Sequence, residues 1–414
     1  MSQGQRYGQG RLGHTMKLKC LADDFQVEEQ ISPLPPRGPF ALYTLTKVSL
    51  GTPEAIEAIL HKWNLSREQV AYAGLKDRHA RTRQFITIKG GPSRGLRETN
   101  LELNYVGQAA RPVHAKDITF NRFAIVLRDL ADDELSAILR ALDLISRDGL
   151  PNYFDSQRFG SVGISGQFIA KPWCLGDYER ALWLALAEDN VHDRPEDREQ
   201  KRILRELWGQ WPECQAALAH SHRRTIVTYL ADKPGEFKRA LTFVPHDMRS
   251  IYLAAFQSDL WNRALAALLQ SACPPESLKN MRIGPRELPF FTALVDAQRL
   301  QLRSAVLPLP SARLHVEEGQ VKQLLDRVLA EEGMELRQVR LKFPRDTYFS
   351  KGERSALFLP QAASAEGGDD ELYRGRRKVT LRFNLTRGSY ATILVKRIAG
   401  EGLAEELGAS AENV

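Results

Sequence analysis

The sequence predicts a chain of mixed strands and helices with room for two domains. Its 414 residues exceed the length at which one hydrophobic core stops growing. Alternating apolar residues over 119–130 and 379–385 predict strands that bury one face. Apolar residues at helical spacing over 132–145 and 251–270 predict helices that pack on a core.

Composition and charge narrow the class of protein. Hydrophobic residues make up 43% of the chain and charged residues 26%, as in ordinary globular proteins. The net charge is +7, and because the segment 401–414 holds four acids and no lysine or arginine, the rest of the chain carries +11. A basic body favours an anionic partner such as RNA, but it does not indicate a fold.

Several other classes lack their sequence signals. No apolar run approaches the length of a membrane span, and the N-terminus has no apolar core of a signal peptide. The cysteines, at positions 20, 174, 214 and 273, form no C-x-x-C pair and indicate neither a disulfide framework nor a zinc site. Since a Gly-rich phosphate loop and a ligand cluster are missing too, we expect a cytoplasmic protein with no metal, nucleotide or redox cofactor.

The stretch 70–90 carries the strongest chemical signal. Asp77 is its single acid, and the bases around it are Lys76, Arg78, His79, Arg81 and Arg83. Gly74 predicts a turn and residues 85–88 a strand, so Asp77 is expected on a connection at the edge of a sheet. Nearby positive charge keeps a carboxylate ionised, which suits nucleophilic attack on a bound polyanion. The alternative is a surface turn with a solvated charge cluster.

The run AGLKDRHARTRQ closely resembles the signature of the TruD family of pseudouridine synthases. In that family the Asp of the G-x-K-D motif is the catalytic nucleophile, so the resemblance gives this role to Asp77. Further family blocks follow in order along the chain. They cover residues 19–160 and 373–398 well and the middle thinly.

Two blocks precede or adjoin the nucleophile. Residues 19–29 resemble K-x-x-x-x-D-F-x-V-x-E, which implies that Phe25 contributes to the uridine site and that Lys19 lies close to Asp77. The alternative for Phe25 is a core residue of an edge strand. A strand then leads to a helix within residues 49–64, with Thr52 as N-cap and Pro53 at its first position. Leu45, Lys47 and Thr52 match the family pattern L-x-K-x-x-x-x-T.

Two blocks follow the nucleophile. The strand 119–130 resembles G-N-x-F-x-I-x-L-R with Phe120 in place of the Gly, which implies that Asn121 contacts the target nucleotide and that Phe123 stacks near the base. The alternative is a turn residue and a core residue. The loop 149–160 resembles P-N-Y-F-x-x-Q-R-F-G and suggests RNA positioning, with Arg158 as a candidate phosphate contact. Asp155 and Ser156 replace the usual Gly-Glu.

The rest of the chain contains one weak block and one strong block. Helices are expected at 176–188, 196–208 and 320–332, and the helix 251–270 carries the pattern A-x-Q-S-x-L-x-N. Residues 360–371 are expected to form a loop of small and acidic residues. The closing block resembles F-x-L-x-x-G-S-Y/F-A-T, which implies that Tyr390 faces the uridine. The Glu that the family often has after this block is absent.

The resemblance implies an α+β fold: a pseudouridine-synthase catalytic lobe with a mixed, mainly antiparallel sheet and flanking helices, plus an inserted α/β (TRUD) domain. The expected parts are a flexible tail 1–15, the catalytic lobe at 16–160 and 346–400, the inserted domain at 161–345 and an acidic tail 401–414.

The implied reaction converts a uridine of RNA to pseudouridine, and the implied target is uridine 13 of transfer RNA. No membrane or protein partner is expected. Asp77 attacks C1′ of the ribose or C6 of the base, and the sequence leaves both open. A non-catalytic RNA-binding protein would not need Asp77, and a hydrolase would need a second acid or a His partner, which we do not find.

Overall fold

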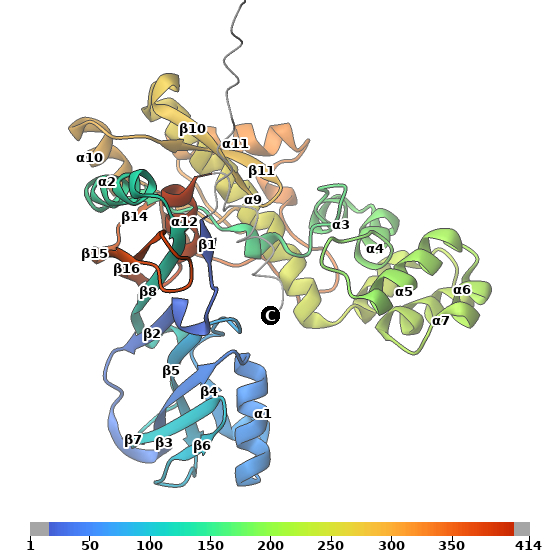
Figure 1. Cartoon of the computed structure of the whole chain (residues 1–414). Helices are drawn as coiled ribbons and strands as arrows, with labels where there is room; N and C mark the ends of the chain where they lie inside the picture. The colour runs from blue at the N-terminus through green and yellow to red at the C-terminus, as the bar shows by residue number, and fades with distance from the viewer. Residues whose placement is uncertain (1–15, 401–414) are drawn as a thin grey trace, which may run out of the picture. The chain divides into compact units, whose positions relative to one another are not determined.

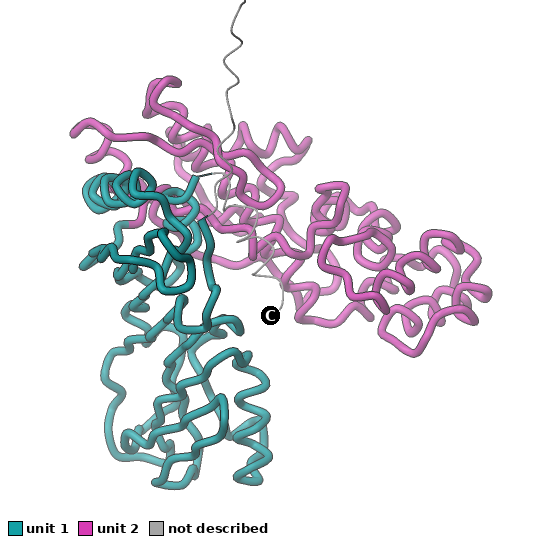
Figure 2. The backbone as a smooth tube through the Cα atoms, viewed as in Figure 1, with its two compact units in different colours: residues 1–147, 359–414 teal, residues 148–358 magenta. Residues whose placement is uncertain are grey.

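The computed structural model describes residues 16–400 (Figure 1), so both expected tails lie outside the described residues. The chain divides into two compact units. Unit 1 joins residues 1–147 to residues 359–414, and unit 2 is residues 148–358 (Figure 2). No helix within residues 16–400 is long and apolar enough to cross a membrane.

Unit 1 is built on one ten-stranded sheet with the order β15-β16-β8-β2-β5-β3-β7-β6, in which β1 also pairs with β8 and β4 with β5. Only β2 and β5 pair in parallel among the described strands of this sheet. Its strands are β1 Lys17–Leu18, β2 Phe25–Ile31, β3 Pro36–Val48, β4 Val70–Tyr72, β5 Arg81–Lys89, β6 Leu96–Glu98, β7 Leu101–Ala109, β8 Ile118–Leu130, β15 Gln361–Asp369 and β16 Arg377–Thr386. Its helices are α1 Thr52–Trp63, α2 Asp132–Asp148 and α12 Ala391–Ala399.

Unit 2 is mainly helical and surrounds the long helix α9, which is buried along most of its length. Its helices are α3 Ala170–Leu175, α4 Tyr178–Leu186, α5 Pro195–Glu206, α6 Trp211–Ala217, α7 His222–Asp232, α8 Phe237–Ala240, α9 His246–Ala272, α10 Asp296–Ser304 and α11 Gln320–Glu331. Three strand pairs complete it: β10 Leu278–Ile283 with β11 Arg286–Phe291, β12 Val306–Pro308 with β13 Glu353–Ser355, and β9 Leu150–Pro151 with β14 Leu357–Phe358. Unit 2 extends beyond both ends of the inserted domain expected at 161–345, because β9 pairs with β14.

Short 3₁₀ turns connect several of these elements: Ala22–Asp24, Arg67–Gln69, Ala115–Asp117, Ser156–Phe159, Leu241–Phe243, Pro275–Ser277 and Leu336–Gln338. The helix α1 covers one face of β3, β5 and β7, where Ile56 and Ile59 pack against Tyr43, Leu45 and Ile86. A mixed, mostly antiparallel sheet with flanking helices is an α+β fold, so the predicted fold class is confirmed.

Two local expectations were wrong. Residues 361–369 form the edge strand β15 rather than a loop, because their backbone pairs with β16. A small residue is needed at position 367, since a Cβ on Gly367 would approach the side chain of Leu135 in α2 to 3.0 Å. At helix α1 the N-cap is Gly51 and not Thr52, whose hydroxyl donates to Gln84 Oε1 at 3.0 Å instead.

Candidate active site

Asp77 lies on the connection from β4 to β5, as its flanking turn and strand signals predicted. Two buried side chains, those of Gln84 and Thr52, form hydrogen bonds to the backbone of this connection. Gln84 Nε2 donates to the Gly74 carbonyl at 3.1 Å, and the Lys76 amide donates to Thr52 Oγ1 at 3.1 Å. Because Thr52 also bonds Gln84, the loop is fixed to both α1 and β5.

Lys47 fixes the backbone at Asp77 itself. Its side chain is fully buried, and its ammonium donates to the carbonyl oxygens of Asp77 and Leu50, each at 2.6 Å, and to that of Lys76 at 3.2 Å. Lys47 points inward because it continues the buried alternation of Tyr43 and Leu45 along β3. Burial lowers the pKa of Lys47 to about 8, while the charge of Asp77 acts in the opposite direction.

A buried ion pair holds the residue before Asp77. Lys76 Nζ lies 2.5 Å from Glu29 Oε2, and the exposed fraction of the side chain is 9% for Lys76 and 0% for Glu29. The other oxygen of Glu29 accepts the Phe85 amide at 3.1 Å. Glu29 thus joins the loop to β2 and β5, and Lys76 is placed to position the loop. Its predicted phosphate contact stays a prediction, which this ion pair disfavours.

The Glu29→Gln variant is expected to lower the free energy of unfolding by about 3 kcal/mol, because it leaves the buried Lys76 ammonium without a countercharge. Urea denaturation measures this loss. The matched control is Glu28→Gln, one residue earlier and on the other face of β2. Glu28 pairs with Arg83 and Arg122 at the surface and is 28% exposed, so its loss should cost under about 1 kcal/mol. Equal costs for the two variants would contradict the role given to the buried pair.

The Asp77 carboxylate is half-buried, and no group within residues 16–400 donates a hydrogen bond to it. The protein therefore fixes its backbone and leaves its oxygens open to a bound molecule. Two buried polar atoms nearby also lack partners among the residues that the structure describes: Thr82 Oγ1 and Asn121 Oδ1. Buried polar atoms without a partner are rare in folded proteins, and a ligand is one way to satisfy them.

The sheet register places those two residues on one face with Lys47 and Glu29. Thr82 lies opposite Lys47 on β3 and opposite Val27 on β2. Asn121 lies opposite Glu29 on β2. Asn121 is thus a strand residue, and the alternative that it belongs to a turn is wrong.

An aromatic cluster continues the same face. The ring of Phe123 stacks on Phe383 at 5.4 Å between centroids and meets the edge of Phe25 at 6.5 Å. Lys19 Nζ lies 4.4 Å from the centroid of the Phe25 ring. Phe25 and Phe123 are buried, so their packing role is observed while their contact with a uridine stays a prediction. Tyr390 is half-buried and is the N-cap of α12.

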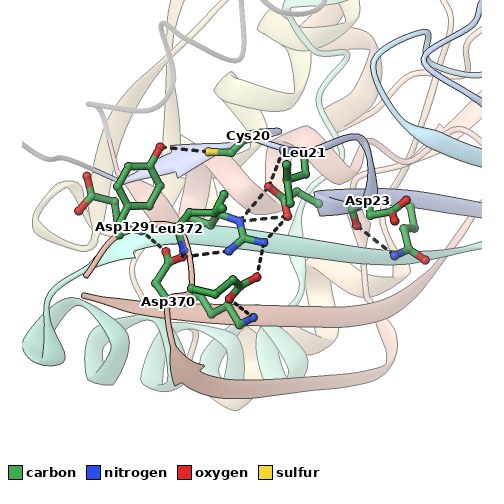
Figure 3. Close-up of polar contacts among 12 residues, drawn as sticks. Cys20, Leu21, Asp23, Asp129, Asp370 and Leu372 are labelled. Carbon is green, nitrogen blue, oxygen red and sulfur yellow. Dashed lines mark hydrogen bonds and ion pairs between the residues drawn. The ribbon is translucent and has the colours of Figure 1, made fainter. Parts of the chain in front are cut away.

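A buried arginine fixes the segment that leads into β2 through polar contacts drawn in Figure 3. Arg128 of β8 bonds Asp24 at 2.8 Å, Asp370 at 3.0 Å and Glu371 at 3.0 Å. These carboxylates raise the pKa of Arg128 above its usual value, with the Asp24 hydrogen bond as the main cause. Asp24 precedes Phe25 directly, so the network joins the start of β2 to the connection between β15 and β16.

The predicted phosphate contacts lie at the surface. Arg78 pairs with Glu54, Arg81 with Asp23 at 2.5 Å and Arg83 with Glu28 at 2.6 Å, while His79 is exposed. In unit 2 Arg158 is exposed and lies over the Phe154 ring at 5.4 Å. Exposed ion pairs contribute little to stability, so phosphates can replace these partners at small cost. No group of three or more His, Cys, Asp or Glu within residues 16–400 has the arrangement of a metal site.

Sequence reasoning gave no role to Lys47, Glu29 or Thr82. The available signal was a charged residue at an inward position of an alternating strand, since Lys47 follows Tyr43 and Leu45 by steps of two. Glu29 follows Phe25 and Val27 in the same way. Such a residue is buried with its charge and must have a specific partner.

Comparison with known proteins agrees with this architecture. A family model described as tRNA pseudouridine synthase D (TruD) matches residues 4–398. A Methanocaldococcus jannaschii protein named "Probable tRNA pseudouridine synthase D 2" is 32% identical over 392 residues, which cover 93% of this chain and 92% of that protein. The tRNA pseudouridine synthase D of Aquifex aeolicus is 27% identical over 394 residues, covering 92% of this chain and 98% of that one.

A crystal structure from Methanosarcina mazei, assigned to tRNA pseudouridine synthase D, matches with a TM-score of 0.72 at 23% identity over 95% of each chain. This likeness shows that the two proteins share a fold. The family model and the 32% identical relative define the class of protein as a pseudouridine synthase, an isomerase. The chain belongs to the TruD family of tRNA pseudouridine synthases.

Proposed function

We propose that this protein converts uridine 13 of transfer RNA to pseudouridine with Asp77 as the nucleophile. The supporting observation is the half-buried Asp77 carboxylate, whose backbone is held by the Lys47 ammonium and whose oxygens accept no hydrogen bond from the described residues. A carboxylate free of internal donors keeps its lone pairs for an electrophilic carbon. The family match supports the reaction, and the motif resemblance supports the target.

The reaction requires the target nucleotide to leave the base stack, because Asp77 cannot reach a base inside a helix. Asp77 attacks C1′ of the ribose or C6 of the uracil, and the bond between N1 and C1′ breaks. The uracil turns while it is held, and C5 bonds C1′. The bond that Asp77 formed to C1′ or C6 breaks and frees the carboxylate, and the proton on C5 is lost as N1 gains one. The isomerisation needs no oxidant, reductant or other substrate.

We infer roles for the remaining predicted residues. Phe25, Phe123 and Tyr390 would contact the uracil, and aromatic contacts to a base are worth ~1–3 kcal/mol each. Asn121 would bond the nucleotide through its unpartnered buried oxygen, and Lys19 would contribute positive charge beside Phe25. Arg78, His79, Arg81, Arg83 and Arg158 would contact phosphates. A cytoplasmic location suits a tRNA substrate.

The decisive test incubates the purified protein with an unmodified transfer RNA transcript and maps pseudouridine at single-nucleotide resolution. A transcript with cytidine at position 13 is the matched control. Pseudouridine at position 13 alone, and none in the control, is the expected result. Modification elsewhere would contradict the target, and no modification of any uridine would contradict the reaction.

The rate of the reaction should depend on the charge of Lys47. The charged groups that interact with it are Asp77, Lys76 and Arg78, and its pKa lies at about 8. Raising the pH through 8 removes the ammonium, and a neutral amine has only two N–H donors for the three carbonyls. The single-turnover rate should therefore fall with an apparent pKa of about 8.

Unfolding would not explain such a fall. The pKa of Lys47 is lower in the folded chain than the ordinary value of 10.5, so the unfolded chain binds more protons between about pH 8 and 10.5. The contribution of Lys47 to stability therefore rises in that window. A Lys47→Arg variant, which stays charged, should lose the alkaline limb. An unchanged limb in this variant would show that another group titrates.

A further inference from the structure

Unit 2 contains a hollow that no predicted site residue lines. Three segments form it: residues 311–313, residues 339–342 and residues 345–349. Its volume is about 590 Å³, within the range of roughly 300–1,000 Å³ of pockets that hold small ligands.

Four basic side chains line this hollow: Arg313, Arg340, Lys342 and Arg345. All four are exposed, and within residues 16–400 none of their side chains has an ion pair or hydrogen bond. Several other arginines of unit 2 are paired, among them Arg299 with Asp148 at 2.9 Å. The hollow thus gathers positive charge that no nearby carboxylate neutralises, which favours a polyanion.

An aromatic side chain stands beside these charges. Tyr348 lines the hollow and is 70% exposed, although large aromatic residues are normally well buried. Its neighbour Phe349 is buried. An exposed ring next to unpaired cations is the arrangement by which proteins hold single-stranded nucleic acid, with the base on the ring and its phosphates on the cations.

Polar contacts fix the walls of the hollow. Gln257 Nε2 donates to the carbonyls of Pro310 at 3.0 Å and Ser350 at 2.8 Å, which lie just outside the first and last lining segments. The Ala312 amide donates to the Val339 carbonyl at 2.9 Å. Asp346 binds Arg249 through both oxygens at 2.8 and 3.0 Å, so this acid is neutralised. Walls held in this way need little ordering when a ligand binds.

We propose that this hollow binds an unpaired nucleotide of the RNA substrate other than the modified uridine. The base stacks on Tyr348, and Arg313, Arg340, Lys342 and Arg345 contact the flanking phosphates. The identity of the RNA as transfer RNA rests on the proposed function. The binding mode rests on the charges, the ring and the fixed walls.

Two variants separate the two parts of the proposal. The double variant Arg340→Ala, Arg345→Ala should weaken binding to an unmodified transfer RNA transcript about tenfold or more. The slope of log affinity against log salt concentration should be shallower by about 1.4, because two phosphate contacts are lost. Tyr348→Ala should weaken binding about 5- to 100-fold without changing that slope.

Matched variants control for charge and ring. Arg327→Ala, Arg337→Ala removes the same charge from exposed positions of unit 2 outside the hollow, and Tyr348→Phe keeps the ring. Both should bind RNA within about threefold of wild type. An equal loss in the arginine control would overturn the proposal in favour of net charge alone.

A second measurement does not depend on variants. Ultraviolet cross-linking of the wild-type protein to a transcript containing 4-thiouridine should yield an RNA-linked peptide from residues 340–349. The proposal is overturned if that peptide is absent and the hollow variants bind RNA like wild type. Binding of inorganic phosphate, or of an acidic protein, with RNA affinity unchanged in the variants would identify a different ligand and overturn it too.

The proposed function and the hollow fail in distinguishable ways. Wild-type protein that binds RNA through the hollow and forms no pseudouridine contradicts the reaction and leaves the hollow intact. Pseudouridine formation together with wild-type RNA affinity in every hollow variant contradicts the hollow and leaves the reaction intact.

Discussion

The Asp77→Asn variant is expected to lose at least about 10⁴-fold in the rate of pseudouridine formation while its affinity for transfer RNA changes less than about threefold. An amide cannot replace a carboxylate as a nucleophile, and the removal of a nucleophile alone lowers kcat by orders of magnitude. Loss of one negative charge does not weaken phosphate contacts. Single-turnover kinetics and a binding assay on the same transcript measure the two quantities.

The matched control for Asp77 is Asp23→Asn, which removes one carboxylate charge from an exposed position of the same unit, where Asp23 pairs with Arg81. Its rate should stay near wild type. The Asp77→Ala variant should behave like Asp77→Asn. A rate for Asp77→Asn within tenfold of wild type would show that another group is the nucleophile.

The Lys47→Met variant is expected to lower the single-turnover rate about 10²-fold or more with little change in KM. Methionine fills a similar volume but donates to none of the three carbonyls that the ammonium holds, among them that of Asp77. A nucleophile misplaced by about 1 Å loses roughly 10²-fold in rate. We regard Lys47 as a positioning residue, because it acts on the backbone of Asp77 and not on the substrate.

The control for Lys47 is Lys62→Met, which removes an exposed ammonium from α1 that pairs with Glu98 at 2.9 Å. A structural role alone would lower stability in Lys47→Met and leave the rate of the folded enzyme unchanged. Thermal unfolding and single-turnover kinetics of both variants therefore separate the two roles. A wild-type rate in folded Lys47→Met would refute the positioning role.

Local sequence pattern was enough for elements that bury one face by themselves. The alternation of Phe123, Ile125 and Leu127 predicted the strand that is β8, and helical spacing predicted α1 and α2. The glycine and the β-branched run around Asp77 predicted its place on a connection. The family resemblance added the roles of residues far apart in the sequence, which periodicity cannot give.

Features that depend on distant partners were not predictable in the same way. β15 is a strand because β16 lies beside it, and α2 restricts the size of the side chain at position 367, whereas the composition of the segment indicated a loop. The hydroxyl of Thr52 bonds Gln84 and the Lys76 amide, although its position suggested a helix cap. The alternating pattern indicated that Lys47 and Glu29 are buried. It did not indicate that both side chains hold the loop that carries Asp77. In each case the deciding atom belongs to a residue more than a few positions away.

The pairing of β16 with β8 affects how the chain folds during translation. Phe383 pairs with Phe123 in the sheet, so 260 residues separate the two strands along the chain. At a synthesis rate of about 5–20 residues per second, β16 emerges roughly 13–52 s after β8. During that interval the nascent chain presents the edge of β8 without its neighbour, and an unpaired edge can associate with other chains. Completion of the sheet, and with it the cover of Phe123, waits for the last part of translation.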